Sequence, residues 1–538
     1  MSQFAPNEGA ASPADSPQKE FDAVTPPADS PQHEIHAATA PEPVKQQGLQ
    51  GFALIFACGA ALFSDGYVNA ISGSVGTILR RLYRDTNPPA FDRFKQLFSS
   101  LAFAGTVVGM LTFGVLSDKI GRKFGMIFAS CWLALFSVLS AGAYGAGGSL
   151  DGLYAALIAY RFIIGIAIGA EYPAGSVAAS ENTEGDGVNK KRQQMYFSLA
   201  TNTMIDFGFV IAAFIPLLLI WICGMDHLRL VWRLSLGFGA VPPLILLYFR
   251  TKMEESKHYQ KSSISKFGQM PWWLIFKRYW VRLAAVSLAW WIYDWVTYPA
   301  GLYSDYILAT VLPDDASFQS NLGWGVVINL FYIPGTLLGA LVNDRLGPKY
   351  TMILGLLMQA VFGFALSGGY SSLKNHIGGF VILYGLFLSA GEFGPGNNLG
   401  LLASKATGPT AVRGTFYGCA AAVGKIGAFV GSYVFDPISI SLSKGNPDAD
   451  IYTTGPFYIG SALALVSATV VFLFIPNIGQ DGMLREDEEF RKYLEENGYD
   501  TSNMGTLKGD VDPSPYESAS ANDSGSSVQE EKPKAADP

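Results

Sequence analysis

Ionisable side chains interrupt the long apolar runs of this sequence, among them Asp65, Glu171, Asp294 and Lys425. An ionised group at membrane depth is costly, so it usually faces the interior of a helix bundle or a wet cavity. A carboxyl group in such a low-dielectric site can take up a proton near neutral pH, and groups of this kind build proton relays. We therefore expect the three acids to couple protons and Lys425 to hold an anion. The alternative is a set of structural salt bridges, with Lys425 as the fixed partner of a carboxylate.

Aromatic residues flank one of these acids. Trp290, Asp294 and Tyr298 are spaced at i, i+4 and i+8, so they share one face of a helix. An indole or phenol on that face can hydrogen-bond an anionic group, and an aromatic ring can hold a cation. Trp291 and Trp295 form a neighbouring stripe, for which we prefer packing or a place at a membrane interface.

The elements that carry these residues are membrane-spanning helices. Of the 538 residues, 49% are hydrophobic and only 15% are charged, which is too apolar for an ordinary soluble protein. The apolar residues come in runs of about 20, the length that crosses a bilayer as a helix. The sequence predicts an all-α membrane protein with twelve spans, at residues 51–79, 96–117, 124–144, 151–177, 193–222, 231–250, 278–309, 322–342, 351–370, 377–402, 412–434 and 455–475.

The chain outside these spans is polar. Residues 1–47 are rich in Pro, Ala, Ser and Glu, which predicts a disordered tail, and we expect no signal peptide before the first span. Residues 251–277 form a basic middle loop, and because Lys and Arg favour cytoplasmic loops we expect both termini in the cytoplasm. Residues 477–538 are acidic and then rich in Ser, Pro and Gly, which predicts a short helix and a largely disordered cytosolic tail. One outside loop opposes this topology, since it holds Arg80, Arg81, Arg84, Arg93 and Lys95.

A charged stretch occurs twice, in corresponding places. One copy follows the second span and the other follows the eighth; their charged residues are Asp118, Arg122 and Lys123, and Asp344, Arg345 and Lys349. The repeat predicts two six-span halves, residues 48–250 and 278–476, around a central cavity. We expect these charges to pair across helix ends in an inward-closed state and to separate as the halves rock, without touching substrate.

Amide side chains are the candidate neutral polar groups. Asn202 and Asp206 share a face at i, i+4, and Asn397 and Asn398 follow a Gly-Pro-Gly break. The offset between the two charged copies pairs Glu171 with Asn397, so we expect these two side chains to face each other across the cavity. Uncharged amides suit hydroxyl groups of a ligand; the alternative is hydrogen bonding between helices.

Two further charged residues receive structural assignments. Arg161 precedes Gly165 and Gly169 at i+4 and i+8, so the glycines form a smooth strip for close helix contact, and we expect Arg161 to organise its helix end. Glu392, just before the Gly-Pro-Gly break, is assigned to structure or gating.

These motifs resemble known families. The two charged copies and Arg161-x-x-x-Gly165-x-x-x-Gly169 resemble the signatures of the major facilitator superfamily, over about residues 50–476. A finer set resembles the phosphate:proton symporter family: Asp65-Gly-Tyr67, Gly169-Ala-Glu171-Tyr172-Pro173, Trp290-x-x-x-Asp294-x-x-x-Tyr298 and Gly424-Lys425-x-Gly427. A third set is similar to the fungal glycerophosphodiester permeases: Ser64-Asp65-Gly-Tyr-Val-Asn69, Gly394-Pro-Gly396 and Ala411-Val-Arg413-Gly414.

The resemblance implies the major facilitator fold and proton-coupled import of an anionic phosphodiester, glycerophosphoinositol or glycerophosphocholine, across the plasma membrane. It implies function as a monomer in the bilayer, without a cofactor. The substrate-binding residues that it and the pattern together indicate are Asn69, Tyr172, Asn202, Trp290, Tyr298, Asn397, Asn398 and Lys425.

Two departures favour a diester over inorganic phosphate. Phosphate carriers of the resembled family typically have Asp where this chain has Asn69, and Asp in place of Glu171. Orthophosphate carries titratable protons, whereas a phosphodiester is a fixed monoanion that needs fewer proton-handling groups around it. Inorganic phosphate:proton symport remains the alternative.

The sequence lacks the signature residues that several other classes of function require. The sugar-porter and drug-antiporter signatures are missing at the corresponding places, and a nutrient sensor remains a separate alternative. None of the five histidines lies in a predicted span, and all four cysteines lie in apolar runs, so we expect neither a metal site nor an enzyme. We also expect no nucleic-acid partner.

Overall fold

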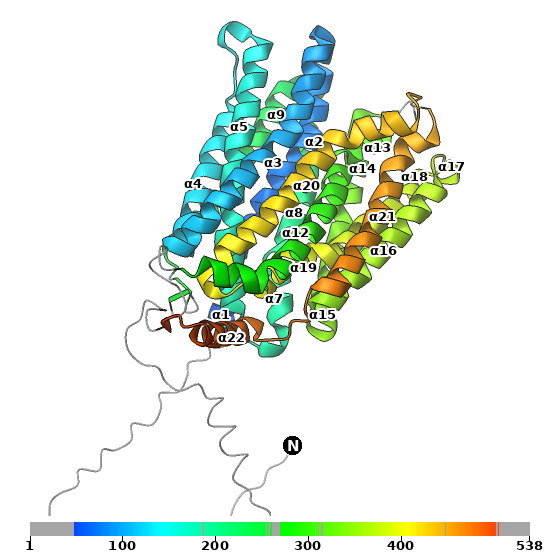
Figure 1. Ribbon diagram of the computed structural model, residues 1–538. Coiled ribbons are helices and arrows are strands. Elements are labelled where there is room, and N and C mark those ends of the chain that lie inside the picture. The colour runs from blue at the N-terminus through cyan, green and yellow to red at the C-terminus, as the bar shows by residue number, and fades with distance from the viewer. Residues whose placement is uncertain are drawn as a thin grey trace, which may run out of the picture. The chain divides into compact units, whose positions relative to one another are not determined.

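Long helices form where the sequence has its apolar runs (Figure 1). The computed structural model describes residues 48–185, 188–253, 255–256, 259–260, 270–309, 311–313, 316–446, 448–501 and 504, and no strand occurs among them. The predicted N-terminal tail, nearly all of the chain beyond residue 501 and parts of the middle loop lie outside the described residues.

Helices of the first half run in chain order from residue 48 to residue 251. They are α1 (Gly48–Gly59), η1 (Ala60–Leu62), α2 (Phe63–Tyr83), η2 (Arg84–Thr86), α3 (Pro88–Lys119), α4 (Arg122–Ala141), η3 (Ala146–Gly148), α5 (Leu150–Glu171), η4 (Tyr172–Ser176), α6 (Val177–Thr183), η5 (Lys190–Arg192), α7 (Gln193–Ala200), α8 (Asn202–Cys223), η6 (Met225–His227), α9 (Leu228–Phe238) and α10 (Val241–Thr251).

Helices of the second half follow the middle loop, and one more helix comes after the last span. They are α12 (Trp272–Leu302), α13 (Ser304–Ala309), α14 (Phe318–Leu330), α15 (Tyr332–Leu346), α16 (Pro348–Gly368), α17 (Tyr370–Leu373), α18 (Ile377–Gly391), η8 (Glu392–Gly396), α19 (Asn397–Ala406), η9 (Thr410–Val412), α20 (Arg413–Leu442), α21 (Asp450–Phe474) and α22 (Gly482–Glu496).

The prediction of twelve spans is confirmed. Within the described residues, eleven helical stretches are long and apolar enough to cross a membrane. The twelfth is α12, 31 residues long, which carries basic residues near its start and Asp294 further on. Several helices continue beyond the predicted ends because their polar termini stay helical; the fourth runs over Leu150–Thr183. The predicted seventh span divides, since α12 ends at Leu302 and α13 begins at Ser304.

The glycine strip on α5 packs against α3, as expected. A Cβ atom added to Gly169 would lie 2.8 Å from the Cα atom of Gly109, so only glycine allows the two backbones to approach this closely. Arg161 on α5 donates hydrogen bonds to the carbonyl oxygens of Val68 on α2 and Phe98 on α3. The arginine therefore ties three helices of the first half together, in agreement with its structural assignment.

Each half has one five-residue π-helical turn that interrupts a long helix. The turn η4 separates α5 from α6, and η8 separates α18 from α19. Pro173 and Pro395 lie in these turns, and a proline removes a backbone donor and clashes with the preceding turn. The first residues of the two turns, Tyr172 and Glu392, both line the cavity described below.

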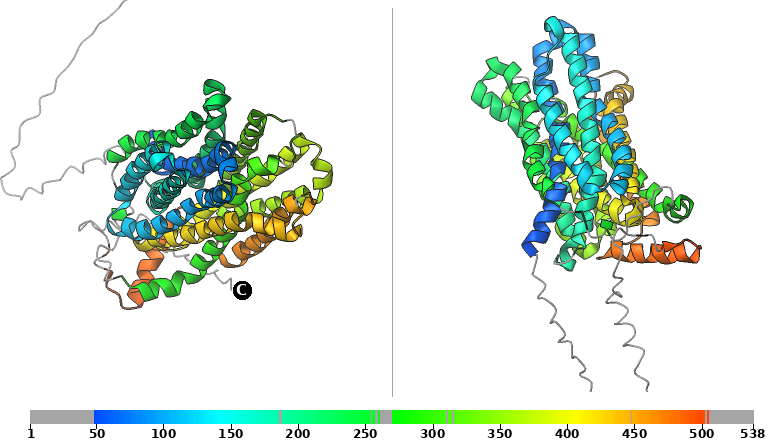
Figure 2. Two further views of the ribbon diagram at one scale, coloured as in Figure 1. Left: turned by 90° about the horizontal axis from the view of Figure 1, so that it is seen from above. Right: turned by 90° about the vertical axis from the view of Figure 1, so that its left-hand side faces the viewer.

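The described helices pack as one bundle. Figure 1 shows α2, α3, α4 and α5 on one side, α16, α18 and α21 on the other, and α12 and α20 between them. Helix α20 packs against both α3 and α12. Helix α22 lies across one end of the bundle in Figure 1 and Figure 2. We name this end the α22 end, and the opposite end, where η2 joins α2 to α3, the η2 end.

Candidate functional site

A cavity lies between the helices of the two halves and holds about 640 Å³ of empty space, part of it continuous with solvent. From the first half it is lined by Leu62, Tyr172, Ser176, Phe197, Thr201, Asn202, Ile205, Asp206 and Phe209. From the second half it is lined by Trp290, Tyr293, Asp294, Thr297, Tyr298, Tyr332, Glu392, Gly396, Leu399, Gly400, Tyr417 and Lys425.

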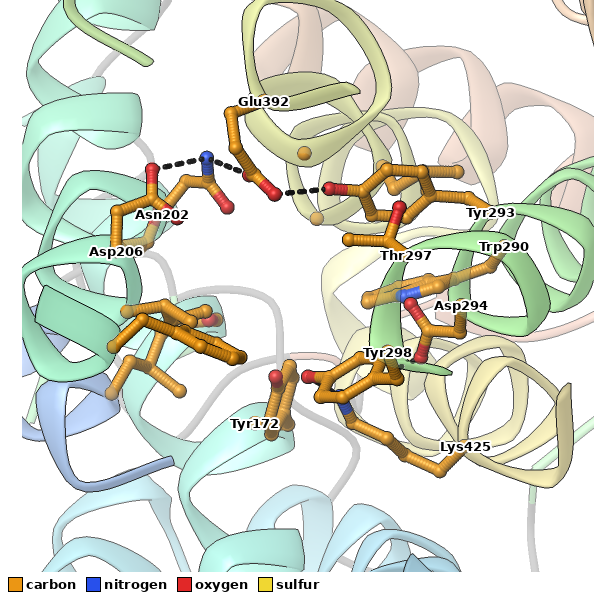
Figure 3. A pocket seen from close by; sticks show the side chains of 18 of the residues that line it. Tyr172, Asn202, Asp206, Trp290, Tyr293, Asp294, Thr297, Tyr298, Glu392 and Lys425 are labelled. Atoms are coloured by element: carbon orange, nitrogen blue, oxygen red, sulfur yellow. Dashed lines mark hydrogen bonds and ion pairs between the residues drawn. The ribbon is translucent and has the colours of Figure 1, made fainter. Parts of the chain in front are cut away.

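One wall of the cavity holds Lys425 and Asp294, and Asp65 lies beside them without lining the cavity; Figure 3 shows part of this group. The Lys425 ammonium on α20 lies 3.5 Å from an oxygen of Asp294 and 3.7 Å from an oxygen of Asp65, and all three side chains are almost fully buried. The Tyr172 hydroxyl donates to Asp65 at 2.5 Å and the Tyr298 hydroxyl donates to the same oxygen at 3.2 Å. Lys425 also donates to the Tyr298 hydroxyl. We call these five residues the Lys425 cluster.

The opposite wall holds two acids, Asp206 and Glu392 (Figure 3). The Asn202 amide lies between them and donates to Asp206 at 3.5 Å as well as to Glu392. Asn202 donates to Glu392 at 3.0 Å, and the Tyr293 hydroxyl donates to Glu392 at 2.7 Å. We call Asp206 and Glu392 the acid pair. No Lys or Arg among the described residues forms an ion pair with either of them.

Two hydroxyl groups in the cavity are available to a ligand. Thr297 and Tyr332 line it, and among the described residues their hydroxyls have no hydrogen-bond partner. A buried polar group without a partner is costly, so a ligand that bonds to these hydroxyls removes that cost.

Glu171 lies elsewhere than we expected. Its two oxygens accept hydrogen bonds from Arg250 at 2.5 and 2.7 Å, and Arg250 also bonds to Met126, Ser130 and Cys58. Glu171 therefore does not line the cavity, and the expectation that it forms a cavity wall is wrong. A bidentate pair with a fully buried arginine satisfies the carboxylate completely, which explains why it points away from the cavity.

The predicted amides divide between the cavity and the packing around it. Asn202 lines the cavity, whereas Asn69 lies behind the Lys425 cluster and donates to Asp65 at 2.7 Å. Asn397 bonds to Thr336 and Asn398 bonds to the Gly394 carbonyl, so neither lines the cavity. For Asn397 the alternative of hydrogen bonding between helices is correct in this structure, whereas Asn398 bonds to a carbonyl four residues earlier on its own helical run.

The error in placing Asn397 has a structural cause. We aligned the halves on their charged loops, but the two π-helical turns align Tyr172 with Glu392. The loop offset therefore misplaces residues near the turns, and it selected Asn397, which lies beyond η8, as the cavity residue. An acid at the start of a Gly-Pro-Gly break was the signal for Glu392 that the sequence offered. No comparable signal distinguished Tyr293, Thr297 or Tyr332.

The acids of the two charged repeats each contact a helix of the other half. Asp118 accepts hydrogen bonds from the backbone N–H groups of Gly414 and Thr415, at 2.9 and 2.6 Å, at the start of α20. Asp344 accepts from the backbone N–H groups of Gln194 and Met195, at 3.1 and 3.3 Å, at the start of α7. A carboxylate at a helix N-terminus is stabilised by unsatisfied donors and by the helix dipole.

The basic residues of the two charged copies make different contacts. Arg122 pairs with Asp118 at 2.7 Å and with Glu181 at 3.1 Å, all fully buried. Among the described residues, the structure gives no ion pair for Lys123, Arg345 or Lys349; Lys349 lies over the rings of Tyr350 and Phe472. Within the described residues, the second copy therefore lacks an ion pair that corresponds to the Arg122–Asp118 pair of the first copy.

Further ionic contacts close the α22 end. Lys405 pairs with Glu184 at 2.6 Å, and Glu184 also accepts from the backbone N–H groups at the start of α22, those of Met483 and Leu484. At the same end Arg413 lies 3.6 Å from Glu181, so both halves and α22 are joined there by buried charges. Sequence analysis did not identify Glu181 or Glu184, because each lies just beyond a predicted span and resembles an ordinary loop acid.

A cation shared by two buried acids, in a cavity between two six-helix halves, defines a membrane transporter of the major facilitator fold. The sequence matches the sugar (and other) transporter family over residues 52–266 and 261–483, so the chain belongs to that family. The resemblance inferred from the motifs is confirmed by relatives of known name.

Two such relatives come from Candida albicans. The chain is 47% identical over 454 residues to the glycerophosphocholine permease GIT4, covering 84% of this chain and 83% of that protein. It is 47% identical over 455 residues to the major glycerophosphoinositol permease GIT3, with 84% and 83% covered. Among solved structures, the proton:xylose symporter XylE bound to 6-bromo-6-deoxy-D-glucose superposes with a TM-score of 0.68 at 18% identity, covering 82% of this chain and 99% of that one, which shows the fold alone.

Proposed function

We propose that this protein is a proton-coupled symporter that imports a glycerophosphodiester across the plasma membrane by alternating access. The glycerophosphocholine and glycerophosphoinositol permeases among its relatives support the substrate class. The observation that carries the mechanism is the Lys425 cluster, in which one buried cation is shared by two carboxyl groups.

The charge of this cluster couples protons to the anion. With Asp65 and Asp294 both ionised, the cluster has a net charge of about −1 and repels an anion. One proton makes it neutral, and two protons leave Lys425 as an uncompensated cation. A phosphodiester is a monoanion near neutral pH, so it binds best when both carboxyl groups are protonated. Loss of these protons on the side of lower proton activity then expels the substrate.

The membrane potential favours the same stoichiometry. Moving one negative charge inward against an inside-negative potential costs roughly 2.3 kcal/mol per 100 mV. One co-imported proton cancels this cost, and a second makes uptake electrically favourable. The two acids of the Lys425 cluster can carry both protons.

The two walls of the cavity suit the two parts of a phosphodiester. The phosphate lies against Lys425 and the hydroxyls of Tyr172 and Tyr298, which donate once Asp65 is protonated. The alcohol lies toward Asn202 and the acid pair, where amide, carboxyl and hydroxyl groups bond to a polyol. The Trp290 ring, which lines the cavity next to the Lys425 cluster, can hold a quaternary ammonium group.

The contacts at the α22 end act as the gate to the cytoplasm. In this proposal the α22 end and both termini are cytoplasmic, and the structure corresponds to a state closed on that side. Asp118 and Asp344 leave the N-termini of α20 and α7 when the halves rock, which opens the cavity inward.

Competition of labelled uptake tests the function. Cells without their own diester carriers express the protein, and uptake of labelled glycerophosphoinositol and glycerophosphocholine is measured at two pH values with each diester or inorganic phosphate as competitor. We expect uptake to be faster at the lower pH and to be inhibited by diesters but not by phosphate. Inhibition by phosphate alone would indicate a phosphate symporter, and a growth response without uptake would indicate a sensor.

A further inference from the structure

A second cavity lies at the η2 end, on the side of the bundle away from α22. It spans about 1140 Å³, including space open to solvent, and both halves line it. The first half contributes Arg80 from α2 and Arg93 and Lys95 from α3, and the second half contributes Tyr303, Ser432 and Asp436. Arg80 and Arg93 are exposed, so the cavity opens to the surrounding solution. We call it the outer cavity.

The outer cavity has an excess of positive charge. Three cations line it against two carboxylates, Asp92 and Asp436. Asp92 lies 3.8 Å from Arg84, a further cation outside the lining, so the lining and this neighbour together hold four basic and two acidic side chains. These arginines and this lysine are the outside residues that oppose the charge rule for cytoplasmic loops, and the central cavity uses none of them.

The second half presents polar and aromatic groups to these cations. Lys95 lies over the ring of Tyr303 at 5.6 Å, and the ring stacks on Phe435 at 5.1 Å. The Tyr303 hydroxyl donates to the Ser432 carbonyl oxygen at 3.0 Å. The Ser432 side chain is 3% exposed, and within the described part of the chain its hydroxyl has no hydrogen-bond partner. A buried hydroxyl beside a cationic cavity is a donor that a bound anion would satisfy.

The outer cavity lies close to the Lys425 cluster along the bundle. Tyr303 follows Tyr298 by five residues, which corresponds to roughly 7.5 Å of helix rise. On α3, Phe103 packs against the Tyr298 ring at 5.0 Å and follows Lys95 by eight residues, or about 12 Å. Phe209 also packs against Tyr298, at 6.3 Å. Phe103, Phe209 and Tyr298 therefore form a group of packed aromatic rings beside the Lys425 cluster.

We propose that the outer cavity is an anion-capture site, which binds the phosphate of a net-anionic phosphodiester before it passes Tyr298 to the Lys425 cluster. The proposal rests on the proposed function and names a substrate preference within it. A diester of a neutral polyol such as inositol has a net charge of −1, whereas a choline diester is a zwitterion with no net charge. A cationic cavity raises the local concentration of the first far more than that of the second.

Neutralising the cavity tests the preference. The variants are Arg80→Gln and Lys95→Gln, singly and together, and the matched control is Arg81→Gln, which removes an exposed charge from the next residue, outside the cavity lining. In proteoliposomes of neutral lipid, the double variant should raise the apparent KM for glycerophosphoinositol about 3- to 10-fold with Vmax unchanged. The KM for glycerophosphocholine should change less than about 2-fold, and added salt should raise the wild-type KM toward the variant value. Arg81→Gln should match the wild type.

Each other outcome has a definite meaning. An unchanged KM in the double variant, or an equal change in Arg81→Gln, would overturn the inference while leaving the proposed function intact. Because Arg80 is exposed, Arg80→Gln alone keeps the test valid if Lys95→Gln does not fold. If the variants differ from the wild type only in vesicles that contain anionic lipid, the residues bind a lipid headgroup and the inference is wrong. Wild-type protein that transports neither diester would refute the proposed function.

Discussion

Two groups of buried charge in this protein each combine acidic and basic side chains, but in different ratios. Glu171 has Arg250 to itself, through two hydrogen bonds of 2.5 and 2.7 Å. Asp65 and Asp294 share one cation, Lys425, at 3.7 and 3.5 Å. The first group is complete without a ligand or a proton, whereas the second has one carboxylate more than its cation can neutralise.

This difference distinguishes a buried ion pair that stabilises the fold from a buried cluster whose net charge can change. A buried pair that loses one partner leaves an uncompensated charge at a cost of about 3–5 kcal/mol, so Glu171 and Arg250 stabilise the fold as a pair. A two-to-one cluster reaches neutrality by taking up a proton, and it becomes a cationic site by taking up a second. We therefore propose that protons couple to transport through the Lys425 cluster and not through the Glu171–Arg250 pair.

Removing the shared cation should have the largest effect. Lys425→Ala leaves Asp65 and Asp294 without a positive partner and removes the cation that we propose binds the phosphate. Truncating one partner of a buried charge pair costs about 2–5 kcal/mol, which corresponds to about a 100-fold loss of uptake at low substrate concentration. Initial rates of labelled diester uptake measure it, with Lys425→Arg as the charge-conserving control. An unchanged apparent affinity in Lys425→Ala would remove this residue from the site.

Neutralising one shared acid should uncouple transport while sparing exchange. Asp65→Asn keeps the shape of the side chain but fixes one position of the cluster in a neutral form. We expect uptake driven by a proton gradient to be lost, while exchange of labelled for unlabelled diester across the membrane persists. Both are measured in proteoliposomes with and without an imposed gradient. Normal gradient-driven accumulation in the variant would exclude Asp65 from coupling.

Neutralising the structural acid should affect stability and not coupling. Glu171→Gln leaves the fully buried Arg250 without its carboxylate and should destabilise the protein by about 3–5 kcal/mol. Thermal unfolding of the purified protein measures the loss, and transport per folded molecule should keep its pH dependence. Glu171→Asp, which retains the charge, should be intermediate in stability. A variant Glu171→Gln with normal stability but no proton coupling would reverse the assignment of the two groups.

The sequence was informative where a side chain's depth and helix face determine its role. The span pattern predicted the twelve helices, and the i, i+4, i+8 spacing placed Trp290, Asp294 and Tyr298 in the cavity. Depth alone did not distinguish Glu171 from Asp65, because the partner of Glu171 is 79 residues away in sequence and lies at the end of another span. Next to a π-helical turn, residue spacing no longer predicts the direction in which a side chain points, because the turn changes the helix face on which that side chain lies.

The acid pair on the opposite wall was missed for a related reason. Glu392 starts the turn η8, and loop-based alignment of the halves assigned its place to Asn397. Asp206 was seen to share a face with Asn202, but its partner comes from the other half of the chain. Contacts between halves depend on how the halves pack, which the span pattern does not contain.

Changing the acid pair should produce the smallest effect and sharpen the contrast between the two walls. Glu392→Gln keeps an acceptor for Asn202 and replaces only the carboxyl group that faces the alcohol of the substrate. Because the cation that we propose binds the phosphate is intact, total uptake should fall little, while the ratio of glycerophosphocholine to glycerophosphoinositol uptake should fall about 3- to 10-fold through loss of a carboxyl partner for the choline cation. Asn397→Ser is the control, since its amide bonds to Thr336 outside the cavity and its selectivity should match the wild type. Equal selectivity changes in both variants would mean that packing around η8, and not the acid pair, sets the choice of alcohol.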